Sequence, residues 1–251
     1  MTHEAFLQDI IDDPDDDGLR LIYADWLDDH GQSPRAELIR VQVELARLPA
    51  GDPRRKGPEA RERRLLGEHG AEWAGALLRP LGGMVTAWKF RRGFVEKVSL
   101  EARGLQHSAD ELFGRAPVRD LTVYLARSRI GHLAALPHLA RLSALTLRNN
   151  ALGGAGARAL ASSPFLGGLT SLDLSRNGLG DDGVRALAAS PHLSRLAALT
   201  LTDNHIGLAG ALALADAFPR LELLELYWNP IEGAARRMLR ARFGARVKLG
   251  G

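Results

Sequence analysis

The sequence contains no cysteine, which excludes disulfide bonds and thiolate metal sites. Its eight histidines are scattered and show no zinc-ligand spacing. Neither a nucleophile–base pair nor a phosphate-binding loop is recognisable. The GGAG stretch at Gly153–Gly156 lies in a repeated turn and lacks the lysine of a phosphate loop. We therefore expect no enzymatic activity, no bound metal and no cofactor.

Long apolar runs are also missing, because no stretch approaches the roughly 20 residues that a membrane helix needs. The first residues, MTHEAFLQDIIDDPDDD, are acidic and lack the basic start and apolar centre of a signal peptide. We therefore expect a cytoplasmic protein without membrane contact.

Charge is unevenly distributed along the chain. Residues 1–30 contain ten acidic residues and one basic residue, a net charge of −9, whereas the whole chain has a net charge of +3. Two interpretations are open. The acidic segment forms a solvated surface of a small module, or it docks electrostatically on the basic remainder or on a second copy.

A calcium loop is a poor match to this acidic segment. Asp13, Asp15, Asp17 and Gly18 match the first half of an EF-hand loop, but the twelfth position falls on Ala24 instead of a glutamate. Carboxylates just before a helix favour the positive end of its dipole. The acidic run therefore predicts a cap for a second helix that begins near residue 17, after a first helix at 2–12.

A single pattern recurs four times between residues 142 and 231. The copies read LSALTLRNNAL, LTSLDLSRNGL, LAALTLTDNHI and LELLELYWNPI. They begin at Leu142, Leu169, Leu196 and Leu221, which are 27, 27 and 25 residues apart. A fixed period of this length is typical of a solenoid. The alternating leucines predict a short strand with one buried face, followed by a turn and an apolar helix.

An asparagine follows the strand in every copy. It is Asn150 (or Asn149) in the first copy, and Asn177, Asn204 and Asn229 in the others. An inward asparagine at a turn can hydrogen-bond backbone groups that a bend leaves unpaired. We predict a structural role for these residues.

The stretch LTSLDLSRNGLGDDGVRALAAS, residues 169–190, resembles a leucine-rich repeat of the ribonuclease-inhibitor-like class. The resemblance is strong over residues 142–231 and weaker over residues 93–141. It implies an α/β fold: a leucine-rich-repeat solenoid of about six coils, with parallel strands on the concave face and helices outside. The weaker copies predict strands near residues 95–100 and 118–123.

The N-terminal segment resembles a second family. The strings LRLIYADWLDDHG, from Leu19, and RAELIRVQVELARL, from Arg35, resemble the bacterial repeat-companion domain of planctomycete-type proteins. The resemblance implies a small all-α module at residues 3–48 placed ahead of a repeat array. We expect Tyr23 and Trp26 to form its small core, and Ile22 to share their helix face.

The remaining segments complete the predicted domain organisation. A helix from Glu59 to about Leu78 is expected to cover the open end of the solenoid. The last helix is expected to turn Met238, Leu239 and Phe243 inward. The predicted segments are a helical module at 1–48, a linker at 49–58, a capping helix and solenoid entry at 59–92, repeats at 93–233 and a C-terminal cap at 234–251.

The outward positions of the strands are the candidate binding surface for a protein partner. Tyr227 and Trp228 stand out, because exposed tyrosine, tryptophan and arginine dominate binding hot spots. Alternatively, Trp228 packs against the C-terminal cap. The candidate binding residues are Thr146, Arg148, Asp173, Ser175, Arg176, Thr200, Thr202, Asp203, Glu225, Tyr227 and Trp228.

Two function classes follow from these observations. The first is a non-enzymatic interaction module that binds an unidentified protein through the concave face. The alternative is binding of nucleic acid or an anionic surface through the basic linker and the arginine-rich C-terminal helix. We expect a monomer, with self-association as the alternative.

Overall fold

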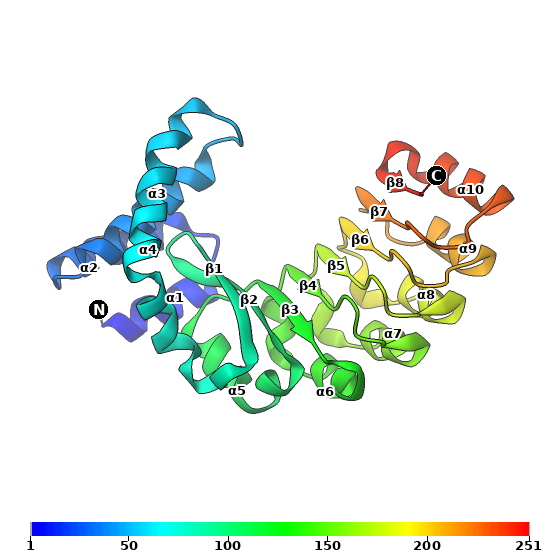
Figure 1. Cartoon of the computed structure of the whole chain (residues 1–251), viewed down its shortest axis with the longest axis horizontal. Coiled ribbons are helices and arrows are strands. Elements are labelled where there is room, and N and C mark those ends of the chain that lie inside the picture. The colour runs from blue at the N-terminus through cyan, green and yellow to red at the C-terminus, as the bar shows by residue number, and fades with distance from the viewer. Residues whose placement is uncertain (1, 251) are drawn as a thin grey trace. The chain divides into compact units, whose positions relative to one another are not determined.

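A computed structural model describes residues 2–250 and divides the chain into two compact units (Figure 1). The first unit runs to Val98 and includes Ser108–Val118; the second comprises Ser99–His107 and the chain from Arg119. The described residues contain ten α-helices and an eight-stranded sheet in the order β1 to β8. The finer segment boundaries expected from the sequence stay predictions.

The first unit begins with three helices, and the second of them has the expected acidic cap. They are α1 (His3–Asp12), α2 (Asp17–Asp29) and α3 (Ser33–Arg47). The Thr2 side chain accepts a hydrogen bond from the Ala5 amide at 3.3 Å, and Asp16 Oδ1 accepts one from Gly18 at 2.6 Å. These side chains satisfy amides that a helix start leaves without a partner. The helix-capping interpretation of the acidic run is confirmed.

A long helix and two strands complete the first unit. The helix is α4 (Lys56–Leu78), preceded by the short helix η1 (Pro53–Arg55) within the expected linker and followed by η2 (Arg79–Met84). Strands β1 (Val85–Arg91) and β2 (Phe94–Glu101) are joined by the two-residue turn Arg92–Gly93. Helix α5 (Ala102–Arg115) follows and is interrupted at Ser108, where φ and ψ are not helical.

The small core predicted around the tyrosine and tryptophan of α2 is present, with one correction. Tyr23 is buried among residues of α1, α3 and β2, and Trp26 packs against this cluster while partly exposed. Ile22, expected on the same face, is 56% exposed. The buried stripe of α2 runs through Arg20, Tyr23, Ala24 and Leu27 instead. A buried arginine therefore occupies a position where the apolar pattern alone predicted none.

The turn between β1 and β2 requires a glycine, which leads to a stability prediction. Gly93 has a φ of +88°, and a Cβ there would lie 2.2 Å from Ile39 Cγ1 and 3.0 Å from Ile39 Cα. We expect Gly93→Ala to lower the free energy of unfolding by about 3 kcal/mol, from backbone strain and overpacking together. Urea unfolding followed by tryptophan fluorescence measures this change.

Gly51 provides a matched control for this substitution. Its φ is +85°, but nothing lies within 4 Å of a Cβ built there. Gly51→Ala should therefore cost only the strain of a left-handed backbone, about 1 kcal/mol. If both substitutions lower the free energy of unfolding by the same amount, the close packing of Gly93 on Ile39 does not contribute to stability.

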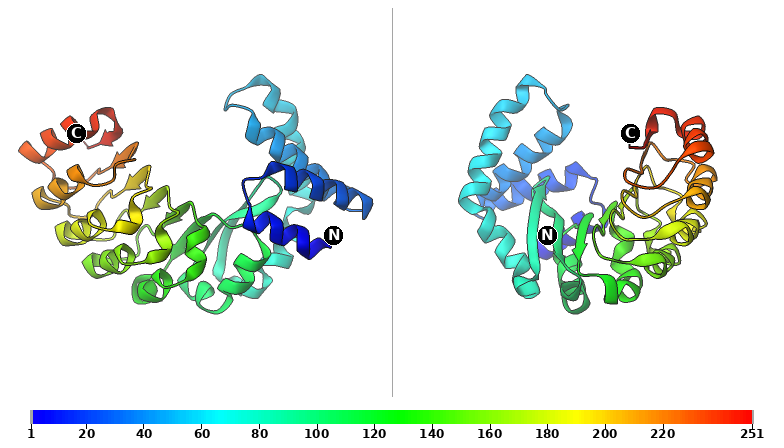
Figure 2. Two further views of the ribbon diagram at one scale, coloured as in Figure 1. Left: turned by 180° about the vertical axis from the view of Figure 1, so that it is seen from behind. Right: turned by 45° about the vertical axis from the view of Figure 1, so that its right-hand side comes forward.

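The second unit is built from short parallel strands, and each of β3 to β7 is followed by a helix (Figure 2). Pairing is in register, with Leu121, Leu145, Leu172, Leu199 and Leu224 aligned across neighbouring strands. All of these leucines are buried, as the alternating pattern predicted. The strands are β3 (Asp120–Tyr124), β4 (Ala144–Thr146), β5 (Ser171–Asp173), β6 (Ala198–Thr200), β7 (Leu223–Glu225) and β8 (Val247–Lys248).

The helices of this unit lie on one side of the strands, as Figure 1 shows for α7 to α10. Short helices at a Ser-Pro or Leu-Pro step close most repeats and bring the chain back to the next strand. The α-helices are α6 (Ile130–Ala134), α7 (Gly153–Ala161), α8 (Gly180–Ala188), α9 (Leu208–Asp216) and α10 (Gly233–Phe243). The short helices are η3 (Arg127–Arg129), η4 (Pro137–Arg141), η5 (Pro164–Leu166), η6 (Pro191–Leu193) and η7 (Gly244–Arg246).

The C-terminal helix was expected, but one of its inward residues was not placed correctly. In α10, Leu239 and Phe243 are buried, whereas Met238 is exposed. Residues 235, 239 and 243 repeat every four positions and form the buried face, so residue 238 falls at its edge. The inward placement of Met238 was wrong.

Candidate functional site

The last residues of the strands and the segments that follow them form three rows of equivalent positions across the second unit. The first row is set by strand pairing, which aligns Thr146 with Asp173, Asp173 with Thr200, and Thr200 with Glu225. The Thr200 hydroxyl donates to Glu225 Oε2 at 3.4 Å, and all four residues are partly exposed. The sequence predicted this alignment correctly, because the repeat period determines which residues become neighbours.

The second row contains Arg148, Ser175, Thr202 and Tyr227. Arg148 and Tyr227 are exposed and Thr202 is partly exposed. Ser175 is only 3% exposed, and its hydroxyl donates to Asp173 Oδ1 at 2.5 Å. Ser175 is therefore satisfied within its own strand and turn, and its expected exposure on the binding surface was wrong.

The third row lies where the strands end and the chain turns. Arg176, Asp203 and Trp228 have φ values of +57°, +55° and +55°. The left-handed conformation is uncommon for residues other than glycine, yet it recurs at the same position of successive repeats. Each of these residues directly precedes the asparagine of its repeat and has the same backbone conformation. The three side chains consequently lie near one another.

The geometry of the third row joins a cation to a carboxylate and an indole. Arg176 Nε lies 3.8 Å from Asp203 Oδ2, and the Arg176 guanidinium carbon lies 5.7 Å from the centre of the Trp228 ring. Trp228 nevertheless remains 70% exposed. Trp228 borders the C-terminal residues Arg236, Leu249 and Gly250, but they do not bury it. Arg176 holds one face of an indole that is otherwise open to a partner.

The four asparagines after the strands form a continuous hydrogen-bonded ladder. The side-chain oxygens of Asn177, Asn204 and Asn229 each accept from two backbone amides of the preceding turn, and that of Asn150 accepts from the Ala126 amide. Their amide nitrogens donate to carbonyl oxygens of their own turn and of the preceding coil. This arrangement assigns the first-copy position to Asn150, because Asn149 is exposed.

The basic segments are largely engaged in contacts within the chain. In the linker, Arg54 pairs with Asp52 at 2.7 Å and Arg55 donates to the carbonyl oxygens of Leu45 and Leu48. On α4, Arg61 and Arg64 both lie within ion-pair distance of Glu37.

The C-terminal arginines show the same behaviour. Arg242 Nε donates to the Ala215 carbonyl at 3.1 Å, and Arg246 Nη1 donates to the Leu221 carbonyl at 2.9 Å. These bonds satisfy carbonyl oxygens at the end of the preceding repeat. The arginine-rich C-terminus therefore has a structural role that its composition alone did not reveal.

The acidic residues of the N-terminal helices also find partners within the first unit. Asp25 and Asp28 each accept a hydrogen bond from Arg40 at 2.6 Å. Asp15 and Asp17 lie 3.4 and 3.7 Å from Arg92. Part of the negative charge is thus compensated locally.

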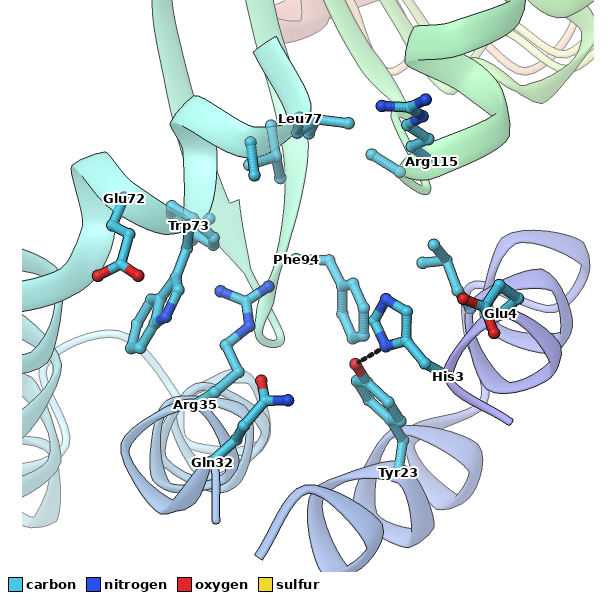
Figure 3. Close-up of a pocket in the computed structure, with 15 residues that line it drawn as sticks. His3, Glu4, Tyr23, Gln32, Arg35, Glu72, Trp73, Leu77, Phe94 and Arg115 are labelled. Carbon is cyan, nitrogen blue, oxygen red and sulfur yellow. Dashed lines mark hydrogen bonds between the residues drawn. The ribbon is translucent and has the colours of Figure 1, made fainter. Parts of the chain in front are cut away.

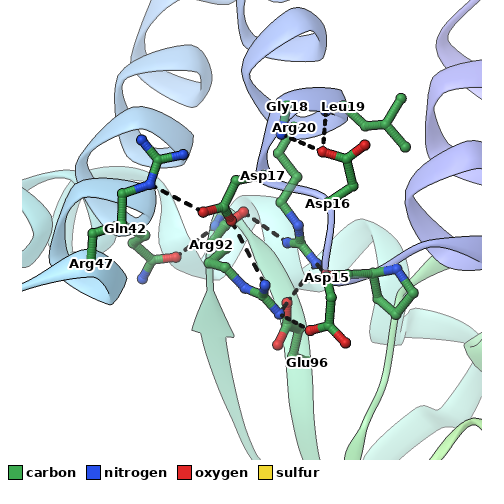
Figure 4. Close-up of polar contacts among 12 residues, drawn as sticks. Asp15, Asp16, Asp17, Gly18, Leu19, Arg20, Gln42, Arg47, Arg92 and Glu96 are labelled. Atoms are coloured by element: carbon green, nitrogen blue, oxygen red, sulfur yellow. Dashed lines mark hydrogen bonds and ion pairs between the residues drawn. The ribbon is translucent and has the colours of Figure 1, made fainter.

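A buried ion pair at the centre of this polar cluster was missed by sequence reasoning (Figure 4). Arg20 Nη2 lies 2.7 Å from Glu96 Oε1 and also donates to the Pro14 carbonyl, while Nη1 donates to the Arg92 carbonyl. Both side chains are almost completely buried. The single available signal was that Arg20, the one base in the first 30 residues, lies on the apolar stripe of its helix.

Two further findings concern residues 2–250 as a whole. No cluster of three or more histidine or acidic side chains in this part of the chain has an arrangement that could hold a metal ion. None of the helices described there is both long and apolar enough to cross a bilayer.

Comparison with known families supports the predicted leucine-rich repeats over part of the chain. A family model described as leucine-rich repeat matches residues 169–188 and 192–215, which include β5, α8, β6 and most of α9. No curated protein matches the sequence at a significant level. Residues 169–215 thus contain leucine-rich repeats.

Proposed function

We propose that this chain is a non-enzymatic interaction module that binds a protein partner through the concave, strand-lined face of the second unit. Leucine-rich repeats generally mediate protein–protein interaction. The parallel pairing of the strands from β3 to β8 supports a repeat solenoid, the architecture on which such a face would be displayed.

The observation that carries this proposal is the exposed aromatic pair at the end of β7. Trp228 is 70% and Tyr227 is 38% exposed, and Arg176 contacts the indole. Burying an exposed tryptophan removes a large apolar area from water, and such side chains supply much of the binding free energy at protein interfaces. Arg148, three repeats earlier in the same row as Tyr227, adds an exposed cation to the face.

The basic segments are a weaker candidate for the binding surface. Nucleic acid is bound chiefly through lysine and arginine side chains that neutralise phosphates. Several arginines of the linker, of α4 and of the C-terminus already contact carboxylates or carbonyl oxygens. Binding of nucleic acid or an anionic surface is therefore retained as an outcome of the test.

The N-terminal helices support a second, more limited proposal. The arrangement of α1 to α3 around Tyr23 is consistent with a compact companion module placed ahead of the repeats. We infer that the module belongs to the repeat-companion family that its sequence resembles. A cytoplasmic location and a monomeric state remain predictions from the sequence.

Mutation of the aromatic pair tests the proposed binding face. The intact protein and a Tyr227→Ala/Trp228→Ala variant are used to capture partners from native lysate at low and high salt, with nuclease. Each identified partner is then purified and titrated calorimetrically. We expect the variant to bind the partner at least about tenfold more weakly, because truncating a hot-spot aromatic costs on the order of 2 kcal/mol.

Trp88 provides the matched control. It is an exposed tryptophan on β1 in the first unit, so Trp88→Ala removes an indole without altering the repeats. This variant should bind as the intact protein does. Equal weakening by both substitutions, or capture of salt-sensitive nucleic acid alone, would contradict binding through the strand-lined face.

A further inference from the structure

The first unit contains a pocket that neither the repeats nor the proposed binding face involves. Its volume is about 600 Å³, within the range typical of small-molecule sites. Side chains from α1, α2, α3, α4, both strands and the end of α5 line it, all within the first unit (Figure 3). Apolar and aromatic groups dominate this lining, and a few polar groups converge among them.

Arg35 is the most informative residue of this pocket. It lies in the first turn of α3, and its guanidinium carbon lies 4.9, 5.0 and 5.6 Å from the ring centres of Trp73, Phe90 and Phe94. Three aromatic rings therefore orient one cation. Contacts with ring faces stabilise a guanidinium, but the rings provide no strong acceptor for its N–H groups.

The charge of Arg35 has no anionic partner among residues 2–250. Its Nη1 atom is fully buried and makes no hydrogen bond. Glu4 and Glu72 line the same pocket, but neither forms an ion pair with Arg35. Burial lowers the pKa of Arg35 to about 10, so the side chain still carries its proton at neutral pH. The Arg35 side chain as a whole is partly exposed, but a buried donor atom without an acceptor is costly, and an anion in the pocket would supply that acceptor.

The pocket also contains polar groups besides Arg35 and the two glutamates, Glu4 and Glu72. The Tyr23 hydroxyl is hydrogen-bonded to His3 Nδ1 at 2.8 Å, and burial raises the pKa of Tyr23 to about 12. Tyr23 therefore stays uncharged. Arg115 and Gln32 add further donors at the border of the pocket. No tyrosinate competes with an incoming anion for Arg35.

We propose that this pocket binds an organic carboxylate whose apolar body occupies the aromatic lining and whose carboxyl group pairs with Arg35. A guanidinium and a carboxylate match in charge and in planar geometry. A phosphate dianion would need several donors inside an apolar pocket, whereas Arg115, the second arginine of the lining, is exposed, so carboxylate is the better match. The carboxyl group comes from a free organic acid or from a peptide C-terminus, and the two sources are distinguished below.

Calorimetric titration of the full chain tests this site. The probes are naphthalene-2-carboxylate, its neutral amide, inorganic phosphate, and a tetrapeptide ending in phenylalanine with a free or an amidated C-terminus. We expect a carboxylate probe to bind at least about tenfold more tightly than its neutral counterpart, a difference of about 1.4 kcal/mol. The indole N–H resonance of Trp73, assigned with Trp73→Phe, should shift on binding.

Arg35→Met removes the charge while keeping a long unbranched side chain. This variant should bind the carboxylate and the amide equally, with the carboxylate weakened at least about tenfold. Arg47→Met, on the same helix but outside the pocket, should leave both affinities unchanged. Thermal unfolding and circular dichroism verify that Arg35→Met folds, which is expected because an unpaired charge is removed.

Each outcome of this comparison has a definite meaning. Binding of the free-terminus peptide without the naphthoate identifies a chain terminus as the source, and the reverse identifies a free acid. Equal binding of acid and amide by the intact protein, or undiminished acid binding by Arg35→Met, overturns the proposal. So does preference for phosphate, or the lack of any carboxylate binding up to about 10 mM, where the binding free energy falls below about 3 kcal/mol.

Discussion

Replacing Arg20 with methionine is expected to lower the free energy of unfolding of the first unit by about 5 kcal/mol at pH 8. The change leaves Glu96 as a buried carboxylate near Arg92, whose Nη2 lies 3.5 Å from Glu96 Oε1. It also leaves the carbonyl oxygens of Pro14 and Arg92 without their donor. Three of the four tryptophans lie in the first unit, so urea unfolding followed by fluorescence measures the loss.

The loss caused by Arg20→Met should depend on pH. In the native protein, burial raises the pKa of Glu96 above its ordinary value of 4.5, against the attraction of Arg20. Without Arg20 the pKa of Glu96 in the folded state rises further, while its unfolded value is unchanged. When the pKa of a carboxyl is higher in the folded than in the unfolded state, the folded state binds the proton more tightly. The group therefore favours folding most at a pH below its unfolded pKa, and it destabilises the fold increasingly as the pH rises through the folded pKa. The destabilisation should therefore be smaller at pH 5 than at pH 8.

Arg40 supplies the control for this prediction. It bridges Asp25 and Asp28 at 2.6 Å, but these side chains are 37% to 75% exposed. Solvent screens exposed ion pairs, so Arg40→Met should cost at most about 1 kcal/mol. A cost for Arg20→Met no greater than that for Arg40→Met, or one independent of pH, would contradict the role assigned to the buried pair.

Replacing Asn177 with alanine is expected to lower the free energy of unfolding of the second unit by about 4 kcal/mol. Its Oδ1 accepts from the amides of Asn150 and Leu152, at 2.9 and 3.4 Å. Its Nδ2 donates to the carbonyl oxygens of Leu147, Leu174 and Ser175. The substitution leaves several buried backbone groups unsatisfied in the middle of the ladder, where water does not reach them.

Asn229 makes an equivalent set of hydrogen bonds at the C-terminal end of the ladder but is partly exposed. Water can take the place of the lost amide there, so Asn229→Ala should cost about half as much or less. Circular dichroism at increasing urea concentrations compares the two variants. If the two losses are the same, burial does not determine the strength of the ladder.

The repeat region was predictable because its information is local. Leucines at alternating positions, an asparagine after them and a fixed period suffice to predict strands, turns and their register. The row formed by Thr146, Asp173 and Thr200 follows from the period alone, since equivalent residues of successive repeats must become neighbours. The exposure of Trp228 did not follow, because it depends on how the C-terminal strand and helix pack beside it.

The first unit was predictable only in its helices and their caps. Thr2 and Asp16 bond amides two or three residues away, so the sequence around each is sufficient. The helix face of α2 was predicted with Ile22 inside and without Arg20, because an apolar pattern cannot anticipate a buried charge. The carboxylate that makes this burial tolerable, Glu96, lies 76 residues away on a strand.

The sequence by itself thus determined the strand–turn–helix period, the register of the strands and the asparagine ladder, because these depend on spacings of a few residues repeated along the chain. Only the tertiary structure decided which polar groups are buried and which are open. The ion pair of Arg20 with Glu96 and the aromatic surroundings of Arg35 join residues from distant helices and strands. Burial and the loss of water are properties of that assembled environment, and no local pattern encodes them.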